Sequence, residues 1–420
     1  MLKTSSFEEN LRAVVGPQNL RAASMGDVVS GVFPQFVAEP DDEHQLAAAL
    51  SLANDAGIAV IPRGGATKLD WGNPPRKADL ILSTARLNRI VEHAWADLTV
   101  TVEAGCTLQR LQETLAQHGQ RLAFDTLWPE HATIGGVLST NDSGTLRLRF
   151  GALRDLIIGV TIALPDGTLA SSGGKVVKNV AGYDLPKLVT GALGTLGVIT
   201  RAVFRLHPLP RSAKTFSFTA ETFQAMQQHI LAIQDSQLAH TSLQVRCAAG
   251  ELPAADILFE ATDVGLVAQE SHLRDLLDST QVEQSPESFW NARQNLWNLP
   301  INTALLAKIS LLPTDIAKTL ESLNSIGESR KVNWQIALQA TGIGMLRLEA
   351  DPILLSEAVE QLRRELQSRG GALVVLRRPP ELHPFDTWGD VGDSVSLMRE
   401  VKHQLDPKST LNPGRFVGGI

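Results

Sequence analysis

Pro62-Arg-Gly-Gly-Ala-Thr-Lys68 is the stretch that decides the fold of the first half of this 420-residue chain. It directly follows the short apolar run Ile58-Ala-Val-Ile61, which predicts a buried strand. Adjacent glycines let a backbone turn sharply and point consecutive N–H groups at phosphate oxygens. Arg63 and Lys68 would add positive charge there, although an ordinary turn is the alternative for any single loop of this kind. The stretch therefore predicts a strand that ends in an anion-binding loop.

Helical and strand patterns alternate on both sides of this loop, from residue 37 to residue 210. A helix is expected over residues 41–54, where acidic residues occupy the first turn and Gly57 ends the pattern. Thr107 is the expected N-cap of a second helix that ends at Gly119. Strands are expected at residues 98–102, 156–164 and 198–206, with a turn at Pro165-Asp-Gly167.

Glycine clusters recur further along the chain, at Gly135-Gly136, Gly173-Gly174, and Gly191 with Gly194 and Gly197. Their spacing matches neither of two familiar phosphate-binding motifs. Lys175 is followed by Val176 and lacks the upstream glycine of a P-loop. The glycines of residues 191–197 also do not follow Gly-x-Gly-x-x-Gly. A P-loop NTPase and a Rossmann enzyme are therefore disfavoured.

After Arg211 the glycine-rich loops become scarce and a different pattern begins. Strands are expected at residues 242–246, 257–260, 305–312, 333–339, 345–349 and 372–377, and helical segments alternate with them. This pattern predicts a second, α+β domain made of a sheet and covering helices. A final helix is expected over residues 391–405, followed by Asp406-Pro-Lys-Ser-Thr-Leu-Asn-Pro-Gly414.

Composition limits the partners of the chain. Its 38 basic and 45 acidic residues give a formal charge of -7 without any Lys/Arg-rich run, which disfavours nucleic acid. No apolar run reaches the roughly 20 residues that span a bilayer, and the first residues do not resemble a secretory signal. Cys106 and Cys247 are too few for an iron–sulfur cluster, which typically needs about four cysteines. We therefore expect a cytoplasmic protein whose electrons, if it collects any, leave through another molecule.

Seven segments, in the same order along the chain, resemble the PCMH-type (vanillyl-alcohol oxidase) FAD-binding family. They are residues 62–68, 102–108, 133–136, 164–167, 178–185, 194–200 and 406–414. The resemblance implies an α+β fold: a PCMH-type FAD-binding domain of two α/β subdomains, plus an α+β cap domain. It places an N-terminal extension at residues 1–36, the FAD domain at 37–210 and the cap at 211–390. Residues 391–420 would return to the FAD domain.

The same resemblance implies FAD as the cofactor and indicates which residues bind it. The loop after the first strand would bind the diphosphate, residues 133–144 the diphosphate and flavin, and residues 194–199 the adenine end. Because the loop contains no histidine or cysteine, a covalent tether to the flavin is not expected there. Some relatives carry a second attachment residue at the position of His131, and a hydrogen-bonding or surface histidine is the expected role here. The expected cofactor-binding residues are Pro62, Arg63, Gly64, Gly65, Ala66, Thr67, Lys68, Pro129, Thr133, Ile134, Gly135, Gly136, Asn141, Ser143, Gly144, Gly194, Gly197, Val198 and Ile199.

No catalytic base follows from the sequence. Family members that oxidise D-lactate or glycolate themselves carry a His-rich Gly-Asp-Gly-Asn segment, and the nearest stretch here, around His383, does not match it. The ten histidines are dispersed without metal-ligand spacing, so no metal site is expected. Hydride abstraction from a hydroxy acid also needs a cation near the carboxylate. Arg293, Lys308, Arg377 and Arg378 are candidates, with a surface position as the alternative for each.

Two functions remain open at this point. The resemblance implies oxidation of a small 2-hydroxy acid such as glycolate, with a homologous flavin subunit and an iron–sulfur subunit as partners. The alternative is a non-catalytic subunit for electron relay or assembly, paired with a catalytic homologous flavin subunit. In either case the protein would be cytoplasmic and would meet the membrane only peripherally, through its partners.

Overall fold

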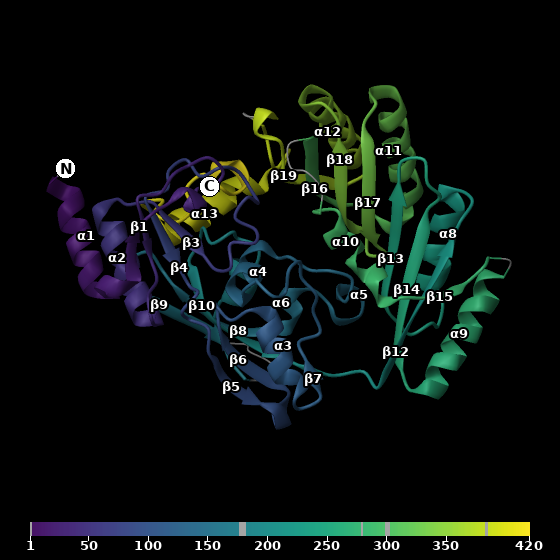
Figure 1. The fold of residues 1–420 in the computed structure, drawn as a ribbon, viewed down its shortest axis with the longest axis horizontal. Helices are drawn as coiled ribbons and strands as arrows, with labels where there is room; N and C mark the ends of the chain where they lie inside the picture. Colours follow the sequence, from purple (N-terminus) through teal and green to yellow (C-terminus); the bar gives the residue numbers. More distant parts are fainter. Residues whose placement is uncertain (1, 176–181, 279, 299–302, 383–384) are drawn as a thin grey trace. The chain divides into compact units, whose positions relative to one another are not determined.

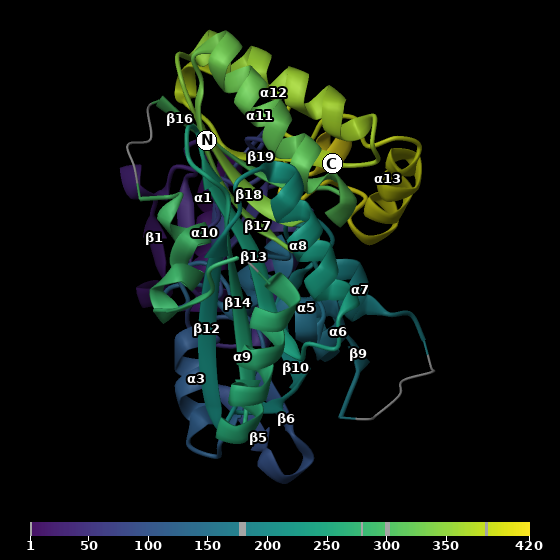
Figure 2. The same cartoon turned by 90° about the vertical axis from the view of Figure 1, so that its right-hand side faces the viewer.

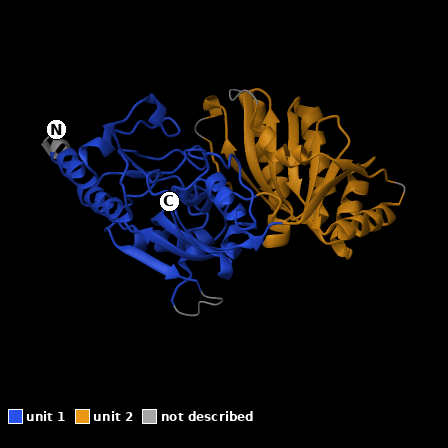
Figure 3. Cartoon of the chain, turned by 60° about the horizontal axis from the view of Figure 1, so that its bottom comes forward, with its two compact units in different colours: residues 1–143, 151–209, 390–420 blue, residues 144–150, 210–389 orange. Residues whose placement is uncertain are grey.

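The computed structural model describes residues 2–175, 182–278, 280–298, 303–382 and 385–420. The chain divides into two compact units (Figure 3). Unit 1 comprises Met1–Ser143, Gly151–Leu209 and Asp390–Ile420, and unit 2 comprises Gly144–Phe150 and Pro210–Gly389. The last residues of the chain thus belong to the same unit as the first half.

The smaller sheet of unit 1 has the strand order β1-β2-β4-β3, in which β2 and β3 run parallel to β4. Its strands are β1 (Leu20–Ala22), β2 (Phe36–Ala38), β3 (Val60–Arg63) and β4 (Leu80–Ser83). Helices α1 (Leu2–Val15) and α2 (Glu43–Ala56) lie together beside this sheet (Figure 1). The predicted helix is α2: Asp42 caps it by accepting hydrogen bonds from the N–H groups of His44 and Gln45.

Helix α1 lies in the expected N-terminal extension, residues 1–36, and belongs to unit 1. Phe7, Leu11 and Val15 recur on one face of α1 and are buried. They pack in one apolar cluster with Leu46 and Leu50 of α2. The apolar face of α1 therefore packs against the apolar face of α2.

The second sheet of unit 1 is antiparallel, with the strand order β5-β6-β10-β8-β9. Its strands are β5 (Ile90–Ala94), β6 (Thr99–Glu103), β8 (Ile157–Ala163), β9 (Leu169–Gly173) and β10 (Val198–Arg205), beside the short pair β7 (Gln120–Arg121) and β11 (His207–Pro208). The helices of this part are α3 (Leu108–Ala116), α4 (Ile134–Thr140), α6 (Leu153–Leu156) and α7 (Leu185–Val189). The predicted N-cap Thr107 accepts a hydrogen bond from Arg110 N–H. Residues 178–181 of the motif at 178–185 lie outside the described residues.

Unit 2 contains an antiparallel sheet with the order β15-β12-β14-β13-β17-β18-β16-β19. Its strands are β12 (Ser212–Thr219), β13 (His240–Ala248), β14 (Ala254–Ala261), β15 (Glu283–Ser285), β16 (Ala304–Ser310), β17 (Asn333–Gln339), β18 (Ile343–Glu349) and β19 (Ala372–Arg377). Each of the six strands predicted after Arg211 is present, and β12 and β15 are additional.

One face of this sheet is covered by helices, and the other carries both polar and apolar side chains. The covering helices are α8 (Phe223–Asp235), α9 (Asp263–Leu277), α11 (Ile316–Arg330) and α12 (Pro352–Gln367) (Figures 1 and 2). Trp334, Ile336 and Leu338 of β17 belong to the core beneath them, whereas Gln335 and Gln339 alternate onto the other face. Two one-turn helices, α5 (Arg147–Phe150) and α10 (Ala292–Asn295), complete the unit.

The C-terminal segment packs against β3 in unit 1. It consists of α13 (Ser394–Leu405) and the turn after it. The Val60 N–H donates to the Thr410 carbonyl at 2.8 Å, and the Asn412 N–H donates to the Val60 carbonyl at 2.9 Å. These bonds cover the open edge of β3, the strand that leads into the glycine loop. Within the described part of the chain, no helix has the length and apolar character needed to cross a membrane.

Candidate cofactor-binding site

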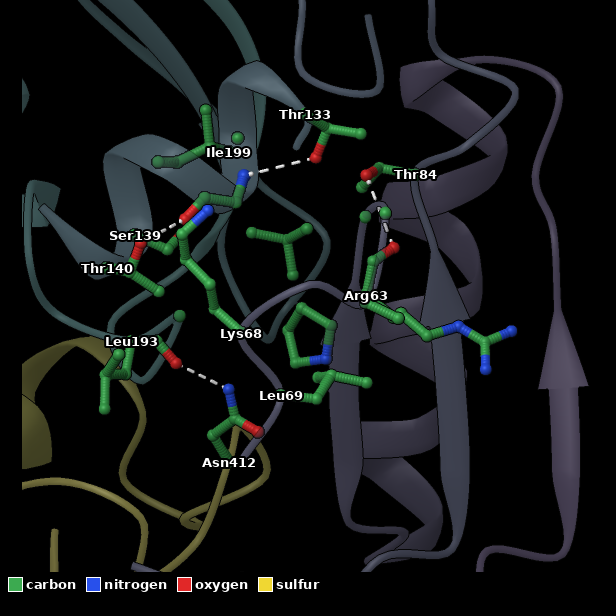
Figure 4. A pocket seen from close by; sticks show the side chains of 18 of the residues that line it. Arg63, Lys68, Leu69, Thr84, Thr133, Ser139, Thr140, Leu193, Ile199 and Asn412 are labelled. Carbon is green, nitrogen blue, oxygen red and sulfur yellow. Dashed lines mark hydrogen bonds between the residues drawn. The ribbon is translucent and has the colours of Figure 1, made fainter. Parts of the chain in front are cut away.

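A pocket that is partly open to solvent lies at the end of β3 in unit 1 (Figure 4). Five separate parts of the chain build it: the glycine loop, the end of β4, helix α4 with its N-cap, the loop before β10 with the start of that strand, and the C-terminal segment. Its lining residues are Pro62, Arg63, Gly64, Gly65, Ala66, Thr67, Lys68, Leu69, Thr84, Thr133, Gly135, Gly136, Ser139, Thr140, Leu193, Gly194, Gly197, Val198, Ile199, Asn412 and Arg415.

The glycine loop offers the pocket a row of backbone donors. Among the described residues, none accepts a hydrogen bond from the N–H groups of Gly64, Gly65, Ala66 or Thr67. Consecutive N–H groups of this kind form a nest that suits phosphate oxygens. The four donors therefore fit the diphosphate of a dinucleotide such as FAD.

Two glycines are required because the loop passes very close to the residues before α4. A Cβ atom on Gly65 would lie 1.8 Å from the His131 carbonyl oxygen. A Cβ atom on Gly64 would lie 2.0 Å from Thr133 Oγ1. Such distances are far inside van der Waals contact, so any side chain here would push the loop away from α4.

Arg63 does not supply the positive charge that the sequence suggested. Its guanidinium points away from the pocket (Figure 4), and Nη1 lies 2.7 Å from Asp27 Oδ1. Arg21 binds the same carboxylate through two further hydrogen bonds. Together with Ser24, Arg21 and Arg63 hold the pKa of the Asp27 carboxyl well below its usual range. Arg63 therefore anchors the strand before the loop, and the backbone of the loop faces the ligand.

Replacing Asp27 with asparagine should lower the stability of the protein in a pH-dependent way. The folded pKa of Asp27 lies below its unfolded value of about 3.9, so its stabilisation is present above that pH and is lost below it. We expect Asp27→Asn to cost about 2–3 kcal/mol at pH 7 and about 1 kcal/mol less than that near pH 3, measured by urea unfolding. Glu8→Gln, which removes an exposed ion pair with Arg12, is the control and should change little. A difference that stays constant with pH would contradict this account.

Lys68 is buried in an ion pair. Its Nζ lies 3.2 Å from Asp142 Oδ2, and both side chains are under 5% exposed. Nζ also donates to the Leu127 carbonyl at 3.3 Å. Its charge is therefore balanced within the protein, and its aliphatic stem contributes to the pocket wall.

Arg415, which the sequence did not indicate, is the cation that joins the C-terminal segment to the glycine loop. Its Nη2 donates to the carbonyls of Leu69 at 2.5 Å and Trp71 at 2.7 Å. Burial lowers the pKa of this guanidinium to about 10, so it remains charged at neutral pH. The C-terminal segment thus fixes the far end of the loop.

Five of the expected cofactor-binding residues do not line this pocket. Ile134 turns its side chain into the core, Asn141 caps the end of α4 with a φ of 48°, and Pro129 uses its carbonyl to accept from Gln109 N–H. Ser143 is buried, and Gly144 is the first residue assigned to unit 2. The other fourteen lie together at the pocket, which also includes seven residues that were not expected: Leu69, Thr84, Ser139, Thr140, Leu193, Asn412 and Arg415. The terminal Leu-Asn-Pro-Gly motif could have indicated Asn412.

Two of the candidate cations of unit 2, Arg377 and Arg378, contact side chains of the same unit. The guanidinium of Arg377 lies 4.8 Å from the centre of the Trp297 ring. Arg378 donates to Thr387 Oγ1 at 3.0 Å, and burial lowers the pKa of its guanidinium. Lys308 lies on β16 opposite Met345, and Arg293 lies on α10. None of these positions identifies a catalytic base.

Histidine and metal chemistry can be placed only in part. His131 is exposed and does not line the pocket, although its carbonyl oxygen borders Gly65. His383 lies outside the described residues. Among the residues that are described, no group of three or more His, Cys, Asp or Glu side chains is arranged to hold a metal ion.

Comparison with known proteins connects this geometry to a cofactor. Residues 34–173 match the family described as "FAD binding domain". The chain is 24% identical to glycolate oxidase subunit GlcD of Bacillus subtilis, over 98% of this chain and 97% of that protein. It is 27% identical to a D-lactate dehydrogenase of Archaeoglobus fulgidus over 91% of each chain. A D-2-hydroxyglutarate dehydrogenase of Xanthomonas citri is 25% identical over 91% of this chain and 89% of the other.

Solved structures show the same fold. The structure of p-cresol methylhydroxylase with substrate bound aligns with a TM-score of 0.81 at 14% identity, over 98% of this chain and 96% of that one. Alkyldihydroxyacetonephosphate synthase aligns with a TM-score of 0.76 at 17% identity, over 98% and 86%.

The fold and the donor-lined pocket define a flavoprotein, and its cofactor is FAD. Residues 34–173 match an FAD binding domain, and the chain is similar along most of its length to FAD-linked 2-hydroxy-acid oxidoreductases, with the fold seen in PCMH-type (vanillyl-alcohol oxidase) proteins. The predicted α+β fold class is therefore confirmed.

Proposed function

We propose that this chain is the FAD-binding subunit of a glycolate oxidase complex. Bound FAD would supply the acceptor for a hydride from a small 2-hydroxy acid, which converts glycolate to glyoxylate. The observation that carries this proposal is the match to subunit GlcD, which extends over 98% of this chain and 97% of the relative. A match of that extent includes both units, so it concerns the cap as well as the cofactor domain.

The residues of unit 1 suit a tightly held, non-covalent cofactor. The N–H groups of residues 64–67 would donate to the diphosphate, and hydrogen bonds to a charged group contribute about 1.5–3 kcal/mol each. Thr133 and the start of α4 would close the other side of the diphosphate. The loop contains no histidine or cysteine that could tether the flavin. Arg63 and Lys68 would act indirectly, because each holds the loop through a buried carboxylate.

An iron–sulfur partner subunit would take the electrons onward. Cys106 and Cys247 are both buried and lie in different units of the chain. Burial raises the pKa of both thiols, that of Cys247 to about 11, which disfavours the thiolate that binds iron. These features support an arrangement in which a homologous flavin subunit and a cluster-bearing subunit accompany this chain. The complex would be cytoplasmic and would touch the membrane only through its partners.

Anaerobic reduction of the purified holoprotein tests this function. We expect the visible flavin absorbance to bleach on addition of glycolate, and turnover to follow when an artificial electron acceptor is present. D-Lactate and D-2-hydroxyglutarate, tested in parallel, would rank the hydroxy acids. A chain that stays oxidised with all three, alone and in the complex, would contradict a role in hydroxy-acid oxidation.

Electron relay without catalysis is the second candidate. It is supported by the described residues, which include no His-rich cluster for a base and metal. In this case the isolated chain would bind FAD but would be reduced only when the homologous flavin subunit and glycolate are both present. Turnover by the isolated chain would eliminate it. An assembly subunit that binds no flavin would instead purify without colour and stay so with added FAD.

A further inference from the structure

Asn412 presents a buried hydrogen-bond acceptor to the cofactor pocket. The residue is 2% exposed and lines the pocket from the C-terminal segment (Figure 4). Its Nδ2 donates to the Leu193 carbonyl at 2.5 Å. Its Oδ1 has no hydrogen-bond partner among the described residues. A buried acceptor left without a donor is costly, so this atom points to a ligand that supplies one.

The backbone around Asn412 is held in an unusual conformation by its neighbours. Asn412 has a φ of 44° and Leu193 a φ of 50°, both in the left-handed region that side chains rarely occupy. Ala66, which also lines the pocket, has a φ of 59°. Three such residues from three separate segments therefore meet at one pocket, and strained backbone of this kind clusters at ligand sites.

The chemistry of an amide oxygen restricts what Asn412 can bind. Oδ1 only accepts hydrogen bonds, so it cannot pair with diphosphate oxygens, which also only accept. The donors of FAD are its sugar hydroxyls, its adenine amino group and a ring N–H. A Cβ atom on Gly194 would lie 3.2 Å from Asn412 Nδ2, which places the amide beside the segment proposed for the adenine end. A hydroxyl next to the diphosphate, on the adenosine side, is the donor nearest to that position along the cofactor.

We propose that Asn412 Oδ1 accepts a hydrogen bond from a ribose hydroxyl in the adenosine half of FAD. The proposal rests on FAD occupying this pocket with its diphosphate at residues 64–67. It makes the C-terminal segment a part of the cofactor site, because the backbone of Asn412 is bonded to β3 and its side chain to the Leu193 loop. Loss of one such hydrogen bond should weaken binding by about 5–10-fold.

Replacing Asn412 with glycine tests the contribution of its side chain alone. Asn412→Gly removes the acceptor and suits the left-handed φ, so the backbone can keep its path. Ser409→Gly is the matched control: it has a φ of 53° in the same segment but is exposed and does not line the pocket. We expect apo Asn412→Gly to bind FAD and ADP about 5–10-fold more weakly than wild type in equilibrium titrations, with FMN unchanged. Ser409→Gly should bind all three as wild type does.

Deoxy ligands identify the hydroxyl, and their binding to the wild type tests the proposal without any variant. Wild-type apoprotein should bind either 2′-deoxy-ADP or 3′-deoxy-ADP about 5–10-fold more weakly than ADP, and Asn412→Gly should bind that analogue and ADP alike. Equal wild-type affinity for ADP and both analogues would overturn the proposal. So would a folded Asn412→Gly variant that binds FAD as wild type does, or one that loses affinity only for FMN. Failure of the wild type to bind FAD at all would instead contradict the assignment of the pocket itself.

Discussion

Gly65→Ala should yield a protein that purifies without flavin and binds added FAD at least about 100-fold more weakly than wild type. The new Cβ atom would lie 1.8 Å from the His131 carbonyl oxygen, which is backbone and cannot rotate away. The loop must therefore shift, and the N–H groups of Gly65 and Ala66 would leave the diphosphate. Two hydrogen bonds to a charged group, at about 1.5–3 kcal/mol each, account for a loss of this size. Flavin absorbance after purification and titration of the apoprotein with FAD measure it.

Gly64 provides an internal comparison because its obstacle is a side chain. Gly64→Ala brings a Cβ atom to 2.0 Å from Thr133 Oγ1, and Thr133→Ala removes that oxygen. The double variant should therefore recover part of the FAD affinity, whereas Gly65→Ala has no side-chain obstacle to remove. Gly174→Ala, where no atom lies within 4 Å of the added Cβ, is the control and should bind FAD normally. Normal FAD affinity in Gly65→Ala would show that the loop does not hold the diphosphate.

Lys68→Met should destabilise the apoprotein by about 3–5 kcal/mol, because it leaves the Asp142 carboxylate buried without its counter-charge. That is a large share of the total stability of about 5–15 kcal/mol found for native proteins. The loss should appear in urea unfolding without any cofactor. If Lys68 instead served mainly as a phosphate ligand, the apoprotein would keep its stability and only FAD binding would suffer.

Two further variants separate charge from packing at this pair. Lys68→Met combined with Asp142→Asn removes both charges and should recover part of the lost stability. Lys187→Met removes a lysine whose ion pair with Asp184 is more than half exposed on both sides, and it should cost less than about 1 kcal/mol. A Lys68→Met protein as stable as the Lys187→Met protein would contradict the buried-pair account.

Local patterns in the sequence predicted the main elements well. The acidic first turn, the glycine at 57 and the apolar face between them define α2 within a few residues. Alternation of apolar residues predicted all six expected strands of unit 2, because one face of that sheet is buried under helices. Strands β1, β2 and β4 were missed. They are only three or four residues long, too short for periodicity to register.

The sequence indicated most of the residues that line the pocket, but it did not indicate the ion pairs formed by the cations around it. Adjacent glycines indicate that the backbone passes close to other atoms. A Cβ atom at Gly64 or Gly65 would collide with Thr133 or His131. The partners of Arg63 and Lys68 are Asp27 and Asp142, 36 and 74 residues away in the sequence, so no local pattern could pair them. For the same reason the sequence suggested free cations where the structure contains ion pairs. Arg415 reaches the glycine loop from the opposite end of the chain and gave no local signal either.

The covering of β3 by residues 410–412 has a consequence for biosynthesis. While the ribosome is still making unit 2, the nascent chain already contains β3 but not the segment that will bond to its edge. An uncovered strand edge is a template for aggregation, so the growing polypeptide carries this exposed edge until residues 410–412 have been made. A complete flavin site must likewise wait for the synthesis of Asn412 and Arg415.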